Sequence, residues 1–403
     1  MAPQYAPKYF LRFVSNALLQ QYFQQRGMLA DFPFWDRAET DVDDLYAAIQ
    51  GPPPEQRSRV ETDFQAITEL ACRGGQQIAL QETPDLMAIF ALMGGYHDRA
   101  CWLFLERPEL FQACLHFLQA DQLSERYWIR TRDLPLAAPD LSPARLEDLR
   151  MAVQSYFLQT EGRGQSCVVE HSQRSGRHYW FAYIEDYGTA DLEFSDSGMY
   201  RRVRRPAFEV VFVHTPSQGA LDVYYHGPKQ AIHELQHRFA FVILGLDLQL
   251  DERGRVYQLD LLKRRTFQFV YDPSWGIRDV VVKSLRLSAA TGTKRHLIFS
   301  ADTSHRPHAM YDFLEQVLET SAAGDPPGLS DEQRKVSLQE FHVTQAEIQV
   351  RFERMGRSGP RPRTFRLTYP NGCNLDHEGV DALLRQMLLA SGLERRSDTA
   401  SAA

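Results

Sequence analysis

Cysteines are few in this sequence, and their spacing excludes two kinds of small stabilised domain. Only five occur in 403 residues, and no two of them form a Cys-x-x-Cys pair. Disulfide frameworks and structural zinc knuckles need clustered, regularly spaced cysteines, so neither is indicated. Scattered single cysteines are typical of a reducing compartment, and we expect a cytoplasmic location. The five are Cys72, Cys101, Cys114, Cys167 and Cys373.

Long apolar runs are also missing. No stretch approaches the roughly 18 uninterrupted apolar residues of a membrane-spanning helix. The N-terminal segment lacks the basic and then apolar pattern of a secretory signal. We therefore expect a soluble protein that has no membrane partner. With 43% hydrophobic residues, the chain can still bury the cores of two or three domains.

The sequence has no overall excess of basic charge. Its formal net charge is -7, and residues 1–150 hold 14 Lys and Arg against 21 Asp and Glu, whereas residues 151–403 hold 31 of each. The acidity of the first part disfavours non-specific nucleic-acid binding there, because it repels phosphate. Phosphate-loop, G-x-G-x-x-G and G-x-S-x-G motifs are absent too, so the common nucleotide-binding and serine-hydrolase classes find no support.

In the first third of the chain, apolar residues recur with the spacing of α-helices, and proline or glycine separates one helical segment from the next. The pattern predicts an N-terminal bundle domain over residues 1–130. A segment rich in leucine and proline, residues 131–143, cannot continue a helix and is interpreted as a linker. The predicted helices span residues 8–28, 40–50, 55–73, 83–94, 96–106 and 108–120, and the pair Gly74-Gly75 is interpreted as the end of the third.

After Gly162, apolar residues alternate along the chain and no longer recur with helical spacing. A pattern of strand, strand and helix then occurs three times. Short turns favour antiparallel pairing, so the sequence predicts an α+β fold with repeated ββα units in a domain over residues 144–393. We expect a sub-boundary near 322–335 and a disordered tail over 394–403. The three units begin at Phe208, Asp279 and Ala346, and further strands are predicted at 256–262 and 267–271.

A predicted helix from Pro228 to Leu244 contains the motif His233-Glu234-x-x-His237. Histidines spaced i and i+4 lie on one side of a helix, where both can bind one zinc ion while the glutamate acts as a general base. The five residues resemble the active-site helix of the zincin metallopeptidases. That resemblance implies His233 and His237 as zinc ligands and Glu234 as catalytic base.

The remainder of the chain departs from the zincin pattern. The metzincin branch needs a glycine and a third histidine where this chain has Ala240 and Ile243. The gluzincin branch needs a glutamate on a following helix, whereas Glu252 falls in an apparent turn and Asp260 in a predicted strand. The alternative interpretation is a helix with two polar histidines on the flank opposite its apolar stripe.

Arginines form two clusters in the second half of the chain. Their planar guanidinium groups suit phosphate, and a neighbouring aromatic strand, Tyr179–Tyr183, offers rings for base stacking. Alternatively, the aromatic residues fill a sheet core and nearby acids neutralise the arginines. The candidate polyanion-binding residues are Arg201, Arg202, Arg204 and Arg205 in the first cluster, and Arg354, Arg357, Arg361 and Arg363 in the second.

These observations favour a non-catalytic cytoplasmic binding protein without a cofactor. Its expected partner is another protein, or nucleic acid or another polyanion held by the arginine-rich hairpin of the second cluster. The competing hypothesis is a zinc-dependent metallopeptidase that uses His233, Glu234 and His237. The oligomeric state stays open at this stage.

Overall fold

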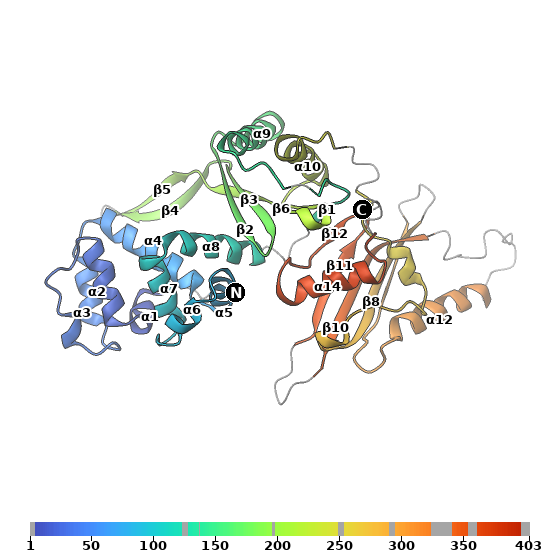
Figure 1. Cartoon of the computed structure of the whole chain (residues 1–403), viewed down its shortest axis with the longest axis horizontal. Coiled ribbons are helices and arrows are strands. Elements are labelled where there is room, and N and C mark those ends of the chain that lie inside the picture. Colours follow the sequence, from blue (N-terminus) through green and yellow to red (C-terminus); the bar gives the residue numbers. More distant parts are fainter. Residues whose placement is uncertain are drawn as a thin grey trace. The chain divides into compact units, whose positions relative to one another are not determined.

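The computed structural model describes residues 5–122, 128–136, 138–195, 198–248, 254–289, 295–323, 341–353 and 361–395. The chain divides into two compact units, Met1–Gln122 and Leu123–Ala403 (Figure 1). Each is described here by itself. In the described part of the chain, no helix is both long and apolar enough to cross a membrane.

The first unit is helical, and its core is built largely from aromatic rings. The ring of Phe64 stacks on Phe10 with centroids 4.2 Å apart and lies 5.0 Å from the ring of Tyr22. This confirms the predicted all-helical N-terminal part. The helices are α1 (Pro7–Phe13), α2 (Asn16–Gln25), α3 (Asp43–Gln50), α4 (Pro54–Leu70), α5 (Arg73–Glu82), α6 (Leu86–Phe90), α7 (Tyr96–Glu106) and α8 (Pro108–Gln122), with a 3₁₀ turn at Phe34–Asp36.

Two details of this unit differ from the prediction. The helix predicted over 8–28 is broken at Ser15, whose extended backbone donates its N–H to the Asp98 carboxylate at 2.7 Å. Helix α5 was missed because Gly74-Gly75 looked like a helix end. A Cβ on Gly75 would lie 2.2 Å from the Leu70 carbonyl oxygen, so this glycine allows α5 to begin directly against the end of α4.

The second unit contains a ten-stranded sheet in which every pair of neighbouring strands is antiparallel. The strand order is β2-β3-β6-β7-β1-β12-β11-β10-β8-β9. This confirms the predicted α+β class with a largely antiparallel region. The strands are β1 (Trp128–Thr131), β2 (Cys167–Arg174), β3 (Arg177–Glu185), β6 (Ala207–Thr215), β7 (Ala220–Tyr225), β8 (Ile277–Ala289), β9 (His296–Ser300), β10 (Phe341–Phe352), β11 (Arg363–Thr368) and β12 (Gly372–Cys373).

The three predicted ββα units are present. Strands β6 and β7 lead into α10 (Lys229–Leu244), β8 and β9 lead into α12 (Ala309–Ala323), and β10 and β11 are followed, after β12, by α14 (Gly379–Ala390). A further helix, α9 (Pro143–Glu161), lies beside α10 (Figure 1). The pattern was readable because each helix carries its apolar residues on one side.

Two hydrophobic cores lie on opposite faces of the sheet. Ile129 packs with α9 and α10 in one core, whereas Cys373, the register partner of Trp128, belongs to the core that contains α12 and α14. Neighbouring residues of a strand point to opposite faces, so β1 joins the two halves of the unit and contributes to both sides.

The predicted boundaries need three corrections. Strand β1 lies between β7 and β12. It is formed by residues 128–130, which were predicted to belong to the helical domain, and by Thr131, which was predicted to belong to the linker. This strand is short and carries an arginine, so it showed no alternating pattern. The tail predicted from residue 394 begins with a residue that is only 2% exposed, Glu394, which forms a bridge to Tyr257.

Two predicted strands are also wrong. Within 256–262 the chain forms a single bridge and a 3₁₀ helix, η4 (Leu259–Lys263), and 267–271 has no regular structure. Most of the sub-boundary predicted near 322–335 lies outside the described residues.

Candidate functional site

Strands β4 (Thr189–Ser195) and β5 (Gly198–Arg204) form a two-stranded ribbon separate from the ten-stranded sheet (Figure 1). The ribbon is inserted between β3 and β6, and its register pairs Phe194 with Met199 near the turn. Every residue of β5 is exposed. The first arginine cluster, Arg201, Arg202, Arg204 and Arg205, lies on β5 and directly after it.

One face of the ribbon is apolar. Alternation along the strands places Leu192, Phe194, Met199 and Val203 on this face, and their exposed fractions are 59, 85, 61 and 73%. Arg201 shares this face, opposite Leu192, and forms no ion pair with any residue in the described ranges. A two-stranded hairpin in water is only marginally stable, so a partner that covers this face would stabilise it.

The opposite face of the ribbon is polar and ion-paired. Arg202 lies 3.4 Å from Glu193, Arg204 lies 3.6 Å from Asp191 and also contacts Glu193, and the Tyr200 hydroxyl donates to Glu193 at 3.2 Å. The Arg204–Asp191 pair is exposed on both sides, and such pairs contribute only about 0–1 kcal/mol. Arg204 can therefore exchange Asp191 for another anion at little cost, whereas the side chain of Glu193 is only 17% exposed.

The second arginine cluster is only partly described. Arg354 and Arg357 lie outside the described residues, and Arg361 is exposed. Arg363 donates two hydrogen bonds to the Asp381 carboxylate, at 2.9 and 2.7 Å. Burial alone would lower the pKa of Arg363, but Asp381 more than offsets this and raises it. The guanidinium group of Arg363 thus holds α14 against β11.

The aromatic strand does not provide a stacking surface. Tyr179, Trp180 and Phe181 of β3 are at most 2% exposed. Trp180 packs edge-on against Phe239 of α10, with ring centroids 4.8 Å apart. The rings fill the core, which was the alternative interpretation of this segment.

Helix α10 carries the His-Glu-x-x-His motif on its less buried flank. All three motif residues are half-buried or exposed, and each contacts a different neighbour. His233 Nδ1 lies 3.3 Å from Gln236 Oε1, His237 Nε2 lies 2.9 Å from Asp247 Oδ1, and Glu234 forms an ion pair with Arg238 at 3.0 Å. The predicted general base is therefore paired with a cation on its own helix.

A third zinc ligand is not found beside the two histidines. In the ranges that the structure describes, no group of three or more His, Cys, Asp and Glu side chains is arranged to hold a metal ion. Asp260, considered as a third ligand, bonds His342 Nδ1 at 2.7 Å instead, and Glu252 lies outside the described residues. Asp247 reaches His237 alone, so the described geometry does not favour the peptidase hypothesis.

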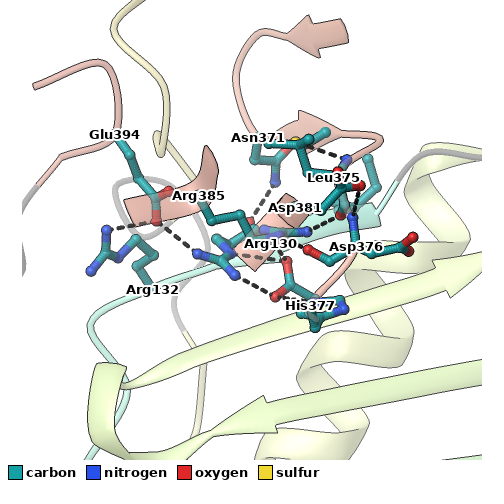
Figure 2. Close-up of polar contacts among 12 residues, drawn as sticks. Arg130, Arg132, Asn371, Leu375, Asp376, His377, Asp381, Arg385 and Glu394 are labelled. Carbon is teal, nitrogen blue, oxygen red and sulfur yellow. Dashed lines mark hydrogen bonds and ion pairs between the residues drawn. The ribbon is translucent and has the colours of Figure 1, made fainter. Parts of the chain in front are cut away.

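The second unit contains a buried ion network that the sequence did not reveal (Figure 2). Arg130 on β1 donates to both oxygens of Asp222 on β7, at 2.9 and 2.7 Å. Arg130 and Arg132 both donate to Glu394 Oε1 at 2.8 Å. His377, directly before α14, donates from Nε2 to Asp222 at 2.9 Å. These contacts join two strands, α14 and the C-terminal segment.

Arg385 of α14 completes the network. Its guanidinium group donates to the backbone carbonyl oxygens of Asp376 and Leu375, at 2.9 and 2.7 Å, and approaches Asp222 to 3.8 Å (Figure 2). Burial alone would raise the pKa of Asp222, but Arg130 and Arg385 hold it well below its usual range. Burial and the neighbouring Arg385 lower the pKa of His377 to about 3, so this imidazole is neutral.

The network is more structural than chemical, because Asp222 accepts three hydrogen bonds and Glu394 accepts two. Sequence reasoning missed it because the members are far apart in the chain. Two signals were visible nonetheless: Arg130 lies among Trp128, Ile129 and Thr131, and Asp222 interrupts an otherwise apolar strand. A lone charge in an apolar strand has to find an opposite charge inside the fold.

The chain matches no known protein-family model, and no curated protein matches it. Function must therefore be inferred from the geometry of its own surfaces.

Proposed function

We propose that this protein is a nucleic-acid-binding protein and that the β4–β5 ribbon is its contact with a duplex. One observation carries the proposal: a separate two-stranded ribbon presents four arginines within five residues and has an entirely exposed second strand. Over residues 189–205, four arginines stand against three carboxylates, so the ribbon is locally basic on a chain of net charge -7.

The shape of the ribbon favours a groove over a single strand. A major groove about 12 Å wide accepts a two-stranded β-ribbon. Single-strand binding would need a row of exposed stacking rings, whereas Tyr179, Trp180 and Phe181 of β3 are buried and the apolar face of the ribbon carries one ring, that of Phe194. Near the turn, Phe194 and Met199 are the types of side chain that proteins wedge between base pairs.

The arginines can supply the electrostatic attraction. Arg201 has no described ion-pair partner, and the side chains of Arg202, Arg204 and Arg205 are 63, 56 and 76% exposed. The Arg204–Asp191 pair, exposed on both sides, contributes little. Each phosphate that is neutralised changes the slope of log K against log salt by about -0.9. If two to four arginines reach phosphates, the slope should lie between about -2 and -4.

Fluorescence anisotropy with a short labelled duplex, at two salt concentrations, tests the proposal. The triple variant Arg201→Gln, Arg202→Gln, Arg204→Gln should lose binding and most of the salt dependence. Arg145→Gln removes an ion-paired arginine of α9 whose side chain is 46% exposed, and this variant should bind as the unmodified protein does. Absence of binding at low salt, or unchanged binding by the triple variant, would contradict the proposal.

We further propose a cytoplasmic location. Supporting it, none of the five cysteines, all of which lie among the described residues, forms a disulfide there. Cell fractionation of the tagged chain checks this, and recovery in an exported fraction would contradict it.

A further inference from the structure

A cavity of about 750 Å³ lies beside the ends of β8 and β10, away from the ribbon and the histidine helix. Its volume falls within the roughly 300–1,000 Å³ typical of small-molecule sites. Five parts of the chain line it: residues 255–260, 288–289 and 342–344, together with Tyr369 and Arg395.

Two arginines give the cavity a positive rim. A short antiparallel contact brings them together: Tyr257 bridges to Glu394, and the N–H of Arg395 donates to the carbonyl of Val256 at 3.0 Å. Neither Arg255 nor Arg395 forms an ion pair with a residue that the structure describes. Two guanidinium groups that line one cavity, and that have no ion pair among the described residues, are suited to an anion with several oxygens.

The buried ion network holds this rim in place. Glu394 accepts hydrogen bonds from Arg130 and Arg132, and Arg132 also donates to the carbonyl oxygen of Arg395. The segment that carries Arg395 is therefore anchored to the sheet through β1. A fixed backbone lowers the entropic cost of presenting the arginine to a ligand.

Asp260 orients a third group that can bind an anion, the imidazole of His342. Its carboxylate accepts from His342 Nδ1 and from the N–H of Val343, each at 2.7 Å, and lies 3.2 Å from Lys263 Nζ. These donors keep Asp260 ionised, so it orients the imidazole through Nδ1. The other ring nitrogen, Nε2, forms no hydrogen bond with a described residue and can donate to an anion when His342 is protonated.

The remaining walls suit a flat, less polar group. Leu259, Ala289 and Val343 provide apolar surface, and the Tyr369 ring is 42% exposed at the cavity. The hydroxyl groups of Ser288 and Thr344 bond each other at 3.1 Å and offer both donors and acceptors. The cavity lining thus combines groups suited to an anion with groups suited to an aromatic ring with polar edges.

We propose that this cavity binds a mononucleotide, with its phosphate between Arg255 and Arg395 and its base against Tyr369. The site is independent of the ribbon, and its ligand is a small molecule rather than a nucleic-acid strand.

Isothermal titration of the full chain with the four ribonucleoside monophosphates, each tested alone, examines the proposal. At least one should bind at least tenfold more tightly than either inorganic phosphate or its own nucleoside, because only the nucleotide can engage both the two arginines and Tyr369. Binding of all four no tighter than that of inorganic phosphate would overturn the proposal.

Variants locate the site. Arg255→Gln with Arg395→Gln should weaken nucleotide binding at least tenfold, while Arg278→Gln, which removes an exposed arginine from β8, should leave it unchanged. Circular dichroism confirms that both variants fold. Unchanged affinity in the double variant would overturn the assignment. So would a loss of nucleotide binding in the ribbon triple variant, since that would place the ligand on the ribbon.

Discussion

Replacing Asp222 by asparagine should destabilise the second unit strongly, although the side chain keeps its size. Asp222 is 0% exposed, accepts two hydrogen bonds from Arg130 and one from His377, and lies 3.8 Å from Arg385. The substitution leaves no cavity, so any loss of stability reports on charge and hydrogen bonding alone.

The magnitude follows from the balance of buried charge. Three guanidinium groups, those of Arg130, Arg132 and Arg385, face two carboxylates, those of Asp222 and Glu394, while His377 is neutral. Removing one carboxylate leaves three buried cations against a single anion. Breaking a buried ion pair by removing one partner typically costs about 3–5 kcal/mol, and we expect Asp222→Asn to fall in this range.

A surface pair with the same separation provides the control. Lys8 and Asp43 are 2.7 Å apart, as are Arg130 Nη2 and Asp222 Oδ2, but their side chains are 51 and 75% exposed. Because water screens exposed pairs, Asp43→Asn should leave stability unchanged within error. The two substitutions make the same chemical change and differ in burial.

Urea unfolding of the full chain, followed by hydrogen exchange and mass spectrometry, measures the effect in each unit separately. This separation is needed because a chain with two units need not unfold in one step. Asp222→Asn should lower the protection of β1, β7 and α14 while α1–α8 stay unchanged. The assigned role of the network is refuted if Asp222→Asn changes the urea midpoint of the second unit by no more than Asp43→Asn changes the urea midpoint of the first unit.

Two further predictions concern pH and glycine packing. The pKa of His377 is depressed to about 3 from an ordinary 6.5, so only the unfolded chain takes up this proton between those values. Stability should therefore fall as pH drops from about 6.5 toward 3, by up to about 1.4 kcal/mol per pH unit for this histidine, and the slope should be shallower in His377→Gln. An unchanged slope in that variant would rule out His377 as its source. Gly75→Ala should destabilise the first unit by about 1–3 kcal/mol, because its Cβ would meet the Leu70 carbonyl. Gly74→Ala, whose nearest neighbour is the flexible end of Leu118 at 3.2 Å, should cost less, and thermal melts of the two variants compare them directly.

Local patterns in the sequence were sufficient to predict the class of fold. Apolar spacing marked most of the N-terminal helices, and the three ββα units were visible because each strand and helix shows its own period over several residues. The same reasoning failed where a short segment or a glycine pair takes its structure from distant neighbours. Strand β1 and helix α5 are the two examples.

The candidate sites divide in the same way. The arginines of the ribbon were visible because four of them fall within five residues, and the flank position of His233 and His237 followed from helical spacing. Tertiary structure alone showed that Arg363 is engaged with Asp381 and that Arg130 meets Asp222 across a buried strand pair. The burial of a side chain, and its pairing with a residue far away in the chain, depend on how whole helices and strands pack. No local pattern in the sequence indicates that packing.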